Sequence, residues 1–135
     1  MLVRVLIVCL AITSLLAFQP QRIEAEPQQI KEPTPKELIS LYASQYGASE
    51  TQLLKVASCE SQFNPNAFHK NDGGKGKHSV GVFQYQESTF DQFDNLIGED
   101  LDYYSYHDQI KLTAYVFAKY PKLKSHWTCY KINYS

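Results

Sequence analysis

Apolar residues recur at helical spacing in four stretches of the chain, each bounded by polar or turn-forming residues. Residues three or four apart lie on one face of an α-helix, so each stretch predicts a helix with one buried face. We expect these helices over residues 35–46, 50–60, 89–97 and 108–119. Short connections between such helices favour a compact helical domain, and the pattern therefore predicts an all-α fold.

The predicted helices carry start and stop signals in their sequence. Thr34 can cap the first helix, and Glu37 stands three residues later, as in a capping box. Gly47 ends this helix, because glycine readily adopts the left-handed conformation found after helix C-termini. Ser49 is the predicted cap of the second helix, and a serine or threonine at 88–89 is that of the third.

The N-terminal residues 1–25 are typical of an export signal. Arg4 gives a positive start, residues 5–18 form an apolar run broken only by Thr-Ser, and Ala25 offers a small residue at the cleavage position. The run is shorter than the roughly 20 residues that a membrane-spanning helix needs, although an uncleaved membrane anchor is the alternative. The proline-rich residues 26–35 then form an extended linker without a core.

Composition narrows the classes of protein to which the chain can belong. Its 135 residues suffice for one domain, and 44% of them are hydrophobic, which is a globular composition. The formal net charge of −1 gives no sign of nucleic-acid binding. We expect a monomer that contacts neither nucleic acid nor, apart from an uncleaved N-terminal segment, a membrane.

Glu60 stands in an unusual place for an acidic residue. On a helix it lies on the same face as three apolar residues, Leu53, Val56 and Ala57. The Asn-Pro pair at 64–65 stops the helix, so Glu60 is expected on the last turn, facing inward. Partial removal from water raises the pKa of a carboxyl, as a general acid near neutral pH requires. The alternative is a helix-end glutamate that reaches solvent.

The residues around Glu60 form two linked motifs. Residues 61–67 read Ser-Gln-Phe-Asn-Pro-Asn-Ala, and residues 79–84 read Ser-Val-Gly-Val-Phe-Gln, followed by Thr-Phe at 89–90. This resembles the catalytic module of soluble lytic transglycosylases, in the goose-lysozyme-like superfamily, over roughly residues 36–130. That family has a glutamate followed by Ser-x-Phe-Asn-Pro-x-Ala, then Ser-x-Gly-Leu-Met-Gln, then a helix opened by Thr-Trp or similar.

The resemblance implies a lysozyme-like helical domain with a cleft, here residues 36–132. It implies that Glu60 is the catalytic residue and that peptidoglycan glycan strands are the substrate. In this family the β-1,4 bond between N-acetylmuramic acid and N-acetylglucosamine is broken by attack of the muramic acid 6-hydroxyl on its own anomeric carbon. One carboxyl then serves first as acid and afterwards as base, and no cofactor is needed.

The resemblance also implies which residues contact the substrate. The segment that includes Gly81, Phe83 and Gln84 lines the cleft opposite Glu60 in the family, and it holds the sugar N-acetyl group and the catalytic carboxyl. Ser79 matches a serine that lies close to the glutamate. For Phe83, packing in the core is an equally good interpretation.

The C-terminal part departs from the family pattern. An Ala-Tyr-Asn-x-Gly element is missing, and residues 114–117, Ala-Tyr-Val-Phe, are a partial echo of it. We therefore take Tyr115 as a candidate sugar contact, although it and its neighbouring tyrosines could equally be packing residues. The chain closes with His-Trp-Thr-Cys at 126–129, which resembles shortened bacterial members of the family.

Two cysteines remain once the predicted signal, with Cys9, is removed: Cys59 and Cys129. An exported chain with two cysteines is expected to pair them, and two separate buried thiols are the alternative. The bond would close about 70 residues and stabilise the fold by roughly 4 kcal/mol in the chain-entropy description. It would also tie the C-terminal tail to the neighbour of Glu60.

Residues 64–80 are predicted to form a loop that is rich in turn formers and locally basic. His69, Asp72 and His78 could be imagined as metal ligands, but their spacing fits no established pattern, so we predict no metal site. Residues 87–108 are acidic, which most simply indicates a solvated face.

We expect an exported enzyme that is periplasmic, wall-associated or secreted. Two other functions remain open. A hydrolytic muramidase on the same fold would use water in place of the 6-hydroxyl, with a second carboxylate such as Asp72, Asp91 or Asp94 as its base. A non-catalytic wall-binding or assembly component of a secretion apparatus would bind the same strands without cleaving them.

Overall fold

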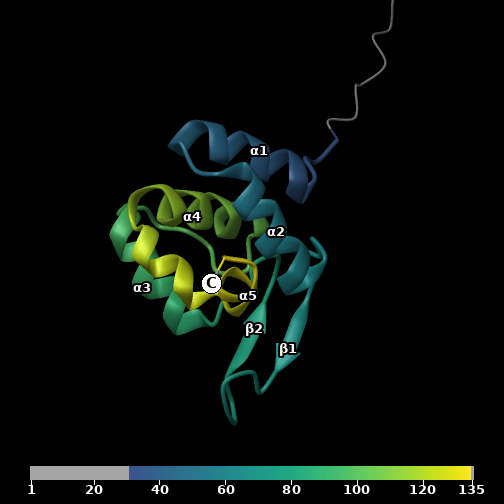
Figure 1. Cartoon of the computed structure of the whole chain (residues 1–135). Helices are drawn as coiled ribbons and strands as arrows, with labels where there is room; N and C mark the ends of the chain where they lie inside the picture. Colours follow the sequence, from purple (N-terminus) through teal and green to yellow (C-terminus); the bar gives the residue numbers. More distant parts are fainter. Residues whose placement is uncertain (1–30, 135) are drawn as a thin grey trace, which may run out of the picture. The chain divides into compact units, whose positions relative to one another are not determined.

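Helices make up most of residues 31–134, the part of the chain that the computed structural model describes (Figure 1). The predictions of an export signal and of the first half of the linker therefore lie outside the described residues. The helical elements are α1 (Pro35–Tyr46), α2 (Glu50–Ser61), α3 (Glu87–Ile97), α4 (Tyr106–Lys119), the 3-10 helix η1 (Pro121–His126) and α5 (Thr128–Tyr134). The predicted all-α fold is confirmed. No helix within residues 31–134 is both long and apolar enough to cross a membrane.

The capping signals of α1 and α2 act as the sequence indicates. The Thr34 hydroxyl accepts the Glu37 N–H at 3.3 Å, and the Glu37 carboxylate accepts the Thr34 N–H at 2.6 Å, which completes a capping box. Gly47 ends α1 with a φ of 76°. The Ser49 hydroxyl accepts the Gln52 N–H at the start of α2. Local sequence therefore sets the bounds of both helices.

The starts of α3 and α4 differ from the prediction. α3 begins after Gln86, not after Ser88 or Thr89, and the Gln86 side chain makes no capping bond. Its amide instead donates to the backbone carbonyl of Asp72 at 2.9 Å, which is a tertiary contact that no helix signal reveals. α4 begins after Ser105, whose hydroxyl accepts a backbone N–H three residues later.

Trp127 lies at the centre of an aromatic core and is 5% exposed. Its indole N–H donates to the carbonyl of Phe83 at 3.0 Å. Four rings surround it with centroids 5.2–6.4 Å away: Phe83, Tyr85, Phe93 and Phe117. A buried indole needs both a partner for its N–H and apolar neighbours, and these contacts join η1, α3, α4 and the turn between β2 and α3.

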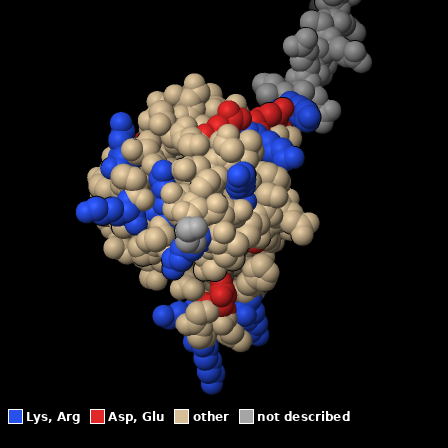
Figure 2. All heavy atoms as spheres, viewed as in Figure 1, with Lys and Arg blue, Asp and Glu red and all other residues tan. Residues whose placement is uncertain are grey.

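The segment that was predicted as a loop contains a β-hairpin. Strands β1 (Phe68–Lys70) and β2 (His78–Val80) pair antiparallel, with Phe68 opposite Val80 and Lys70 opposite His78. The turn formers of residues 71–76 make its tip. The hairpin projects from the helices, and lysine side chains gather at this end of the molecule (Figures 1 and 2). The loop prediction was wrong because both strands are too short to show a pattern.

Gly81 makes the turn that follows β2. It has a φ of 78°, and its N–H donates to the carbonyl of Ala67 at 2.8 Å. A Cβ at this position would lie 2.1 Å from the Oε1 atom of Gln109, a residue of α4 that is 1% exposed. The Gln109 amide donates to the carbonyl of Tyr103 and so cannot easily move away. The turn therefore packs directly against Gln109 of α4.

We expect Gly81→Ala to destabilise the domain by about 2–5 kcal/mol, because left-handed strain adds to overpacking against Gln109. The measurement is the free energy of unfolding in urea. Gly98→Ala is the matched control, since Gly98 has a φ of 72° but nothing within 4 Å of the added Cβ. It should cost only about 1–2 kcal/mol. Equal decreases in the free energy of unfolding of the two variants would contradict the proposed overpacking against Gln109.

Candidate active site

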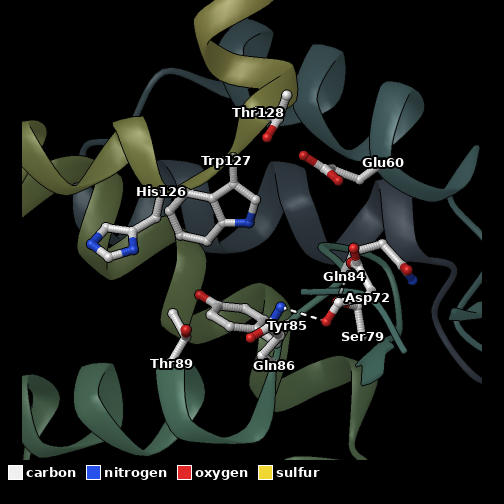
Figure 3. Close-up of a pocket in the computed structure, with 10 residues that line it drawn as sticks. All are labelled: Glu60, Asp72, Ser79, Gln84, Tyr85, Gln86, Thr89, His126, Trp127 and Thr128. Atoms are coloured by element: carbon white, nitrogen blue, oxygen red, sulfur yellow. Dashed lines mark hydrogen bonds between the residues drawn. The ribbon is translucent and has the colours of Figure 1, made fainter. Parts of the chain in front are cut away.

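Glu60 lies on the last turn of α2, as predicted, and its side chain is half-buried. Its carboxyl points into a cleft (Figure 3). The helix stops one residue later, where Gln62 and Phe63 both adopt left-handed conformations, with φ of 55° and 64°. Each such residue costs roughly 1 kcal/mol or more, and strain of this kind gathers at functional sites.

Two hollows meet at Glu60. The first, of about 260 Å³, is lined by Glu60, Asp72, Ser79, Gln84, Tyr85, Gln86, Thr89, His126, Trp127 and Thr128 (Figure 3). The second, of about 590 Å³, is lined by Cys59, Glu60, Ser61, Gln62, Asn64, Asn66, Ala67, Phe68 and His69. A carboxyl between two hollows is well placed to act on a bond that joins two units of a polymer.

The groups around Glu60 shift the pKa of its carboxyl. Burial is the main cause that raises the pKa of this carboxyl, and the nearby negative charge of Asp72 raises it further. The backbone N–H of Cys129, which donates to Glu60 Oε1 at 3.3 Å, and the ring of His69 lower it by smaller amounts. The predicted upward shift of the pKa is therefore confirmed in direction.

Asp72 reaches the first hollow from the hairpin tip. The Ser79 hydroxyl donates to Asp72 Oδ2 at 2.6 Å, and the Gln86 amide donates to the Asp72 carbonyl. Ser79 is 1% exposed. The structure thus brings Ser79 into the same hollow as Glu60, and the serine hydroxyl holds a second carboxylate there.

Gln84 also lines the first hollow, where the turn after β2 places it with a φ of 51°. Its side-chain nitrogen donates to the carbonyls of Gly81, at 2.8 Å, and Ala67. Its side-chain oxygen bonds Nδ1 of His69. The amide is therefore held rigidly in the wall of the cleft.

Three of the predicted substrate-binding residues lie elsewhere. Phe83 is fully buried against Trp127, which corresponds to the alternative interpretation of core packing. The Tyr115 hydroxyl donates to the carbonyl of Leu96 in α3. Neither side chain lines either hollow, and Gly81 faces the interior. The physical reasons are that Phe83 packs against the ring of Trp127 and that the hydrogen bond to Leu96 directs the Tyr115 side chain toward α3.

Other residues of the site gave little or no signal in the sequence. His126 and Thr128 line the first hollow beside Trp127, whereas the sequence indicates only that their motif resembles the end of shortened family members and gives no role to either side chain. Phe68 lines the second hollow and is 56% exposed, with its ring 5.1 Å from that of His78. An aromatic residue in a predicted loop carries no mark of such a position.

The predicted disulfide is confirmed. Cys59 in α2 and Cys129 in α5 are bonded, with their Cα atoms 5.9 Å apart. The bond joins the residue that precedes Glu60 to the residue whose N–H contacts the Glu60 carboxyl.

The imagined metal ligands do not gather at one point. His69 bonds Gln84, whereas the ring of His78 packs against Phe68. Within residues 31–134 no group of three or more histidine, cysteine, aspartate or glutamate side chains could hold a metal ion.

Glu60→Gln should stabilise the folded domain near neutral pH. Burial raises the folded-state pKa of Glu60 above its unfolded value, so the parent loses stability as the pH rises through the folded pKa. Glutamine removes the charge and still accepts the Cys129 N–H. We expect the melting temperature to rise by a few degrees near pH 7 and to match the parent at about pH 3.

Glu50→Gln is the control for this comparison, because Glu50 is exposed in the first turn of the same helix. The negative charge of Glu50 interacts favourably with the N-terminus of α2, so its removal should not stabilise the protein. A Glu60→Gln variant that is less stable than the parent near pH 7 would contradict the assignment of a desolvated carboxyl.

Comparison with protein families places this geometry in a known context. The family model described as "Transglycosylase SLT domain" matches residues 37–122, which include Glu60, the hairpin and the turn after it. Neither the comparison with curated proteins nor that with solved structures gave a match. Because the match spans more than half of the chain, the chain belongs to the transglycosylase SLT domain family, which acts on peptidoglycan.

Proposed function

We propose that this chain cleaves the β-1,4 bond between N-acetylmuramic acid and N-acetylglucosamine by a single-glutamate lytic transglycosylase mechanism. The observation that carries the proposal is the half-buried carboxyl of Glu60 at the junction of two hollows. A glycan strand that occupies both hollows would present its scissile oxygen to this carboxyl.

The first step uses Glu60 as a general acid. Its raised pKa favours the protonated form relative to an ordinary glutamate, and it donates its proton to the glycosidic oxygen. The bond from that oxygen to the muramic acid anomeric carbon breaks, and N-acetylglucosamine leaves with a free 4-hydroxyl. The muramic acid N-acetyl oxygen stabilises the positive charge that develops on the sugar.

The second step uses the same carboxyl as a base. Glu60, now a carboxylate, takes the proton of the muramic acid 6-hydroxyl while that oxygen bonds the anomeric carbon. The product is a 1,6-anhydro end, and Glu60 regains its proton. The Cys129 N–H supports the transient carboxylate, because a hydrogen bond to the charged form favours it.

We further propose that Ser79 and Gln84 contribute to sugar binding from the wall of the first hollow. The Gln84 amide is fixed by His69 and by two backbone carbonyls, so it can meet the sugar without loss of side-chain freedom. Gly81 acts through the turn that it makes. The domain acts outside the cytoplasm, where its disulfide persists, after export directed by residues 1–25.

A hydrolytic reaction is the second candidate, and one observation favours it. Of the three aspartates considered from the sequence, Asp72 shares the first hollow with Glu60, whereas Asp91 and Asp94 lie on α3 and line neither hollow. A carboxylate across the hollow could hold a water against the anomeric carbon, as inverting enzymes do. The product would then have a reducing end.

Muropeptide mass spectrometry tests the reaction directly. Purified cell wall is digested with residues 26–135 and, in parallel, with the Glu60→Gln variant. We expect anhydro-ended products from the parent and a loss of roughly 100-fold or more in the variant, because the general acid/base is gone. A parent that releases no product but retains wall binding would indicate the non-catalytic function instead.

Asp72→Asn separates the two candidate reactions. A transglycosylase needs no second base, so we expect this variant to keep anhydro-ended products, with a rate within about tenfold of the parent. Asp91→Asn is the control, because Asp91 is exposed on α3. Reducing-ended products from the parent that disappear in Asp72→Asn, but not in Asp91→Asn, would establish hydrolysis with Asp72 as the base.

A further inference from the structure

Cys129 takes part both in the disulfide and in a hydrogen bond to the Glu60 carboxyl. Cys59 precedes Glu60 in α2, and its partner Cys129 donates its backbone N–H to Glu60 Oε1 at 3.3 Å. We propose that Cys129 is a positioning residue, and that the disulfide clamps α5 over Glu60 to keep its carboxyl oriented and shielded from water. Activity then requires the oxidised protein. This inference rests on the proposed function for its effect on the reaction.

The disulfide adds a covalent link to the packing contacts that hold the short helix α5. This helix spans only seven residues, and helices of that length are marginal without tertiary contacts. Ile132 on this helix is 72% exposed, so it contributes little burial. The Tyr130 ring does pack at 5.8 Å from that of Phe117. Covalent attachment of Cys129 to α2 adds to these contacts a direct constraint on the first turn of α5, where the Cys129 N–H meets Glu60.

The rest of the fold does not depend on this bond in the same way. Trp127, two residues earlier, is buried among four rings and bonded to the carbonyl of Phe83. The contacts between α1 and α4 are the most extensive between any two elements in the described part of the chain. Reduction should therefore loosen α5 while the helical core remains folded.

Loosening α5 changes the pKa of Glu60 in a defined direction. The groups that act on its carboxyl are Asp72 from the hairpin tip, His69 from β1 and the Cys129 N–H from α5, and His126 lines the same hollow. Burial is the largest cause of the raised pKa, and the Cys129 N–H opposes it more weakly. Entry of water as α5 moves away removes the larger effect, so the pKa falls toward its ordinary value.

The experiment compares the oxidised protein, the same protein after treatment with a trialkylphosphine, and a Cys59→Ser/Cys129→Ser double variant. The phosphine transfers two electrons to the disulfide and becomes a phosphine oxide with oxygen from water, whose two protons give two thiols. Near-ultraviolet circular dichroism is recorded against temperature for all three forms, and a temperature is chosen at which each form is folded. Wall cleavage is then measured across the pH range, and the Glu60 carboxyl is titrated by carbon-13 NMR.

We expect the reduced protein and the double variant to cleave about 10–100-fold more slowly near pH 7, because Glu60 is misplaced. The alkaline limb of the rate profile should move to lower pH, and reoxidation should restore both rate and profile. Leu38→Ala is the control, since it removes a buried side chain of α1 and destabilises the fold without touching α5. It should leave the alkaline limb where it is in the parent.

An unchanged NMR pKa of Glu60 after reduction would overturn the inference, whatever the activity. Loss of the near-ultraviolet signal on reduction would overturn it as well, because the bond would then hold the whole fold rather than α5. If the oxidised protein cleaves no wall but the Glu60 pKa falls on reduction, the positioning of Glu60 by the disulfide stands and the proposed reaction is wrong.

Discussion

The burial of Trp127 is the constraint on which the site depends. Its indole N–H must find a partner away from water, and the carbonyl of Phe83 provides it. This bond fixes the turn after β2, which carries Gln84, against the C-terminal segment, which carries Thr128. The packing of Phe93 and Phe117 around the same ring adds α3 and α4 to the assembly. The contacts of Trp127 thus hold together segments of the first hollow that are far apart in the sequence.

The residues around Glu60 are not arranged for maximal stability. A carboxyl is partly removed from water, and three residues without glycine's freedom, Gln62, Phe63 and Gln84, adopt left-handed conformations. Each feature costs free energy that the core and the disulfide must offset. The same features place an acid with a raised pKa at the junction of two hollows. Stability and the proposed function therefore make opposite demands on the end of α2.

The segment beyond the family match contributes part of the site. The match ends at residue 122, yet His126, Trp127 and Thr128 line the first hollow and Cys129 contacts Glu60. The matched residues supply the carboxyl, the hairpin and the turn. The last residues of the chain close the cleft from the other side and tie themselves to α2 through the disulfide.

Interactions between near neighbours in the chain could be read from the sequence, because helical spacing and capping are local. The bounds of α1 and α2 and the inward face of Glu60 belong to this group. The disulfide joins residues 70 apart, and it could be predicted for another reason, because only two cysteines remain after the predicted signal. The hairpin, the Ser79–Asp72 bond and the placing of His126 in the cleft could not be predicted, because they depend on contacts between distant segments. Phe83 illustrates the limit. The sequence left the cleft and the core as equally good positions for its side chain, and only the tertiary contact with Trp127 placed it in the core.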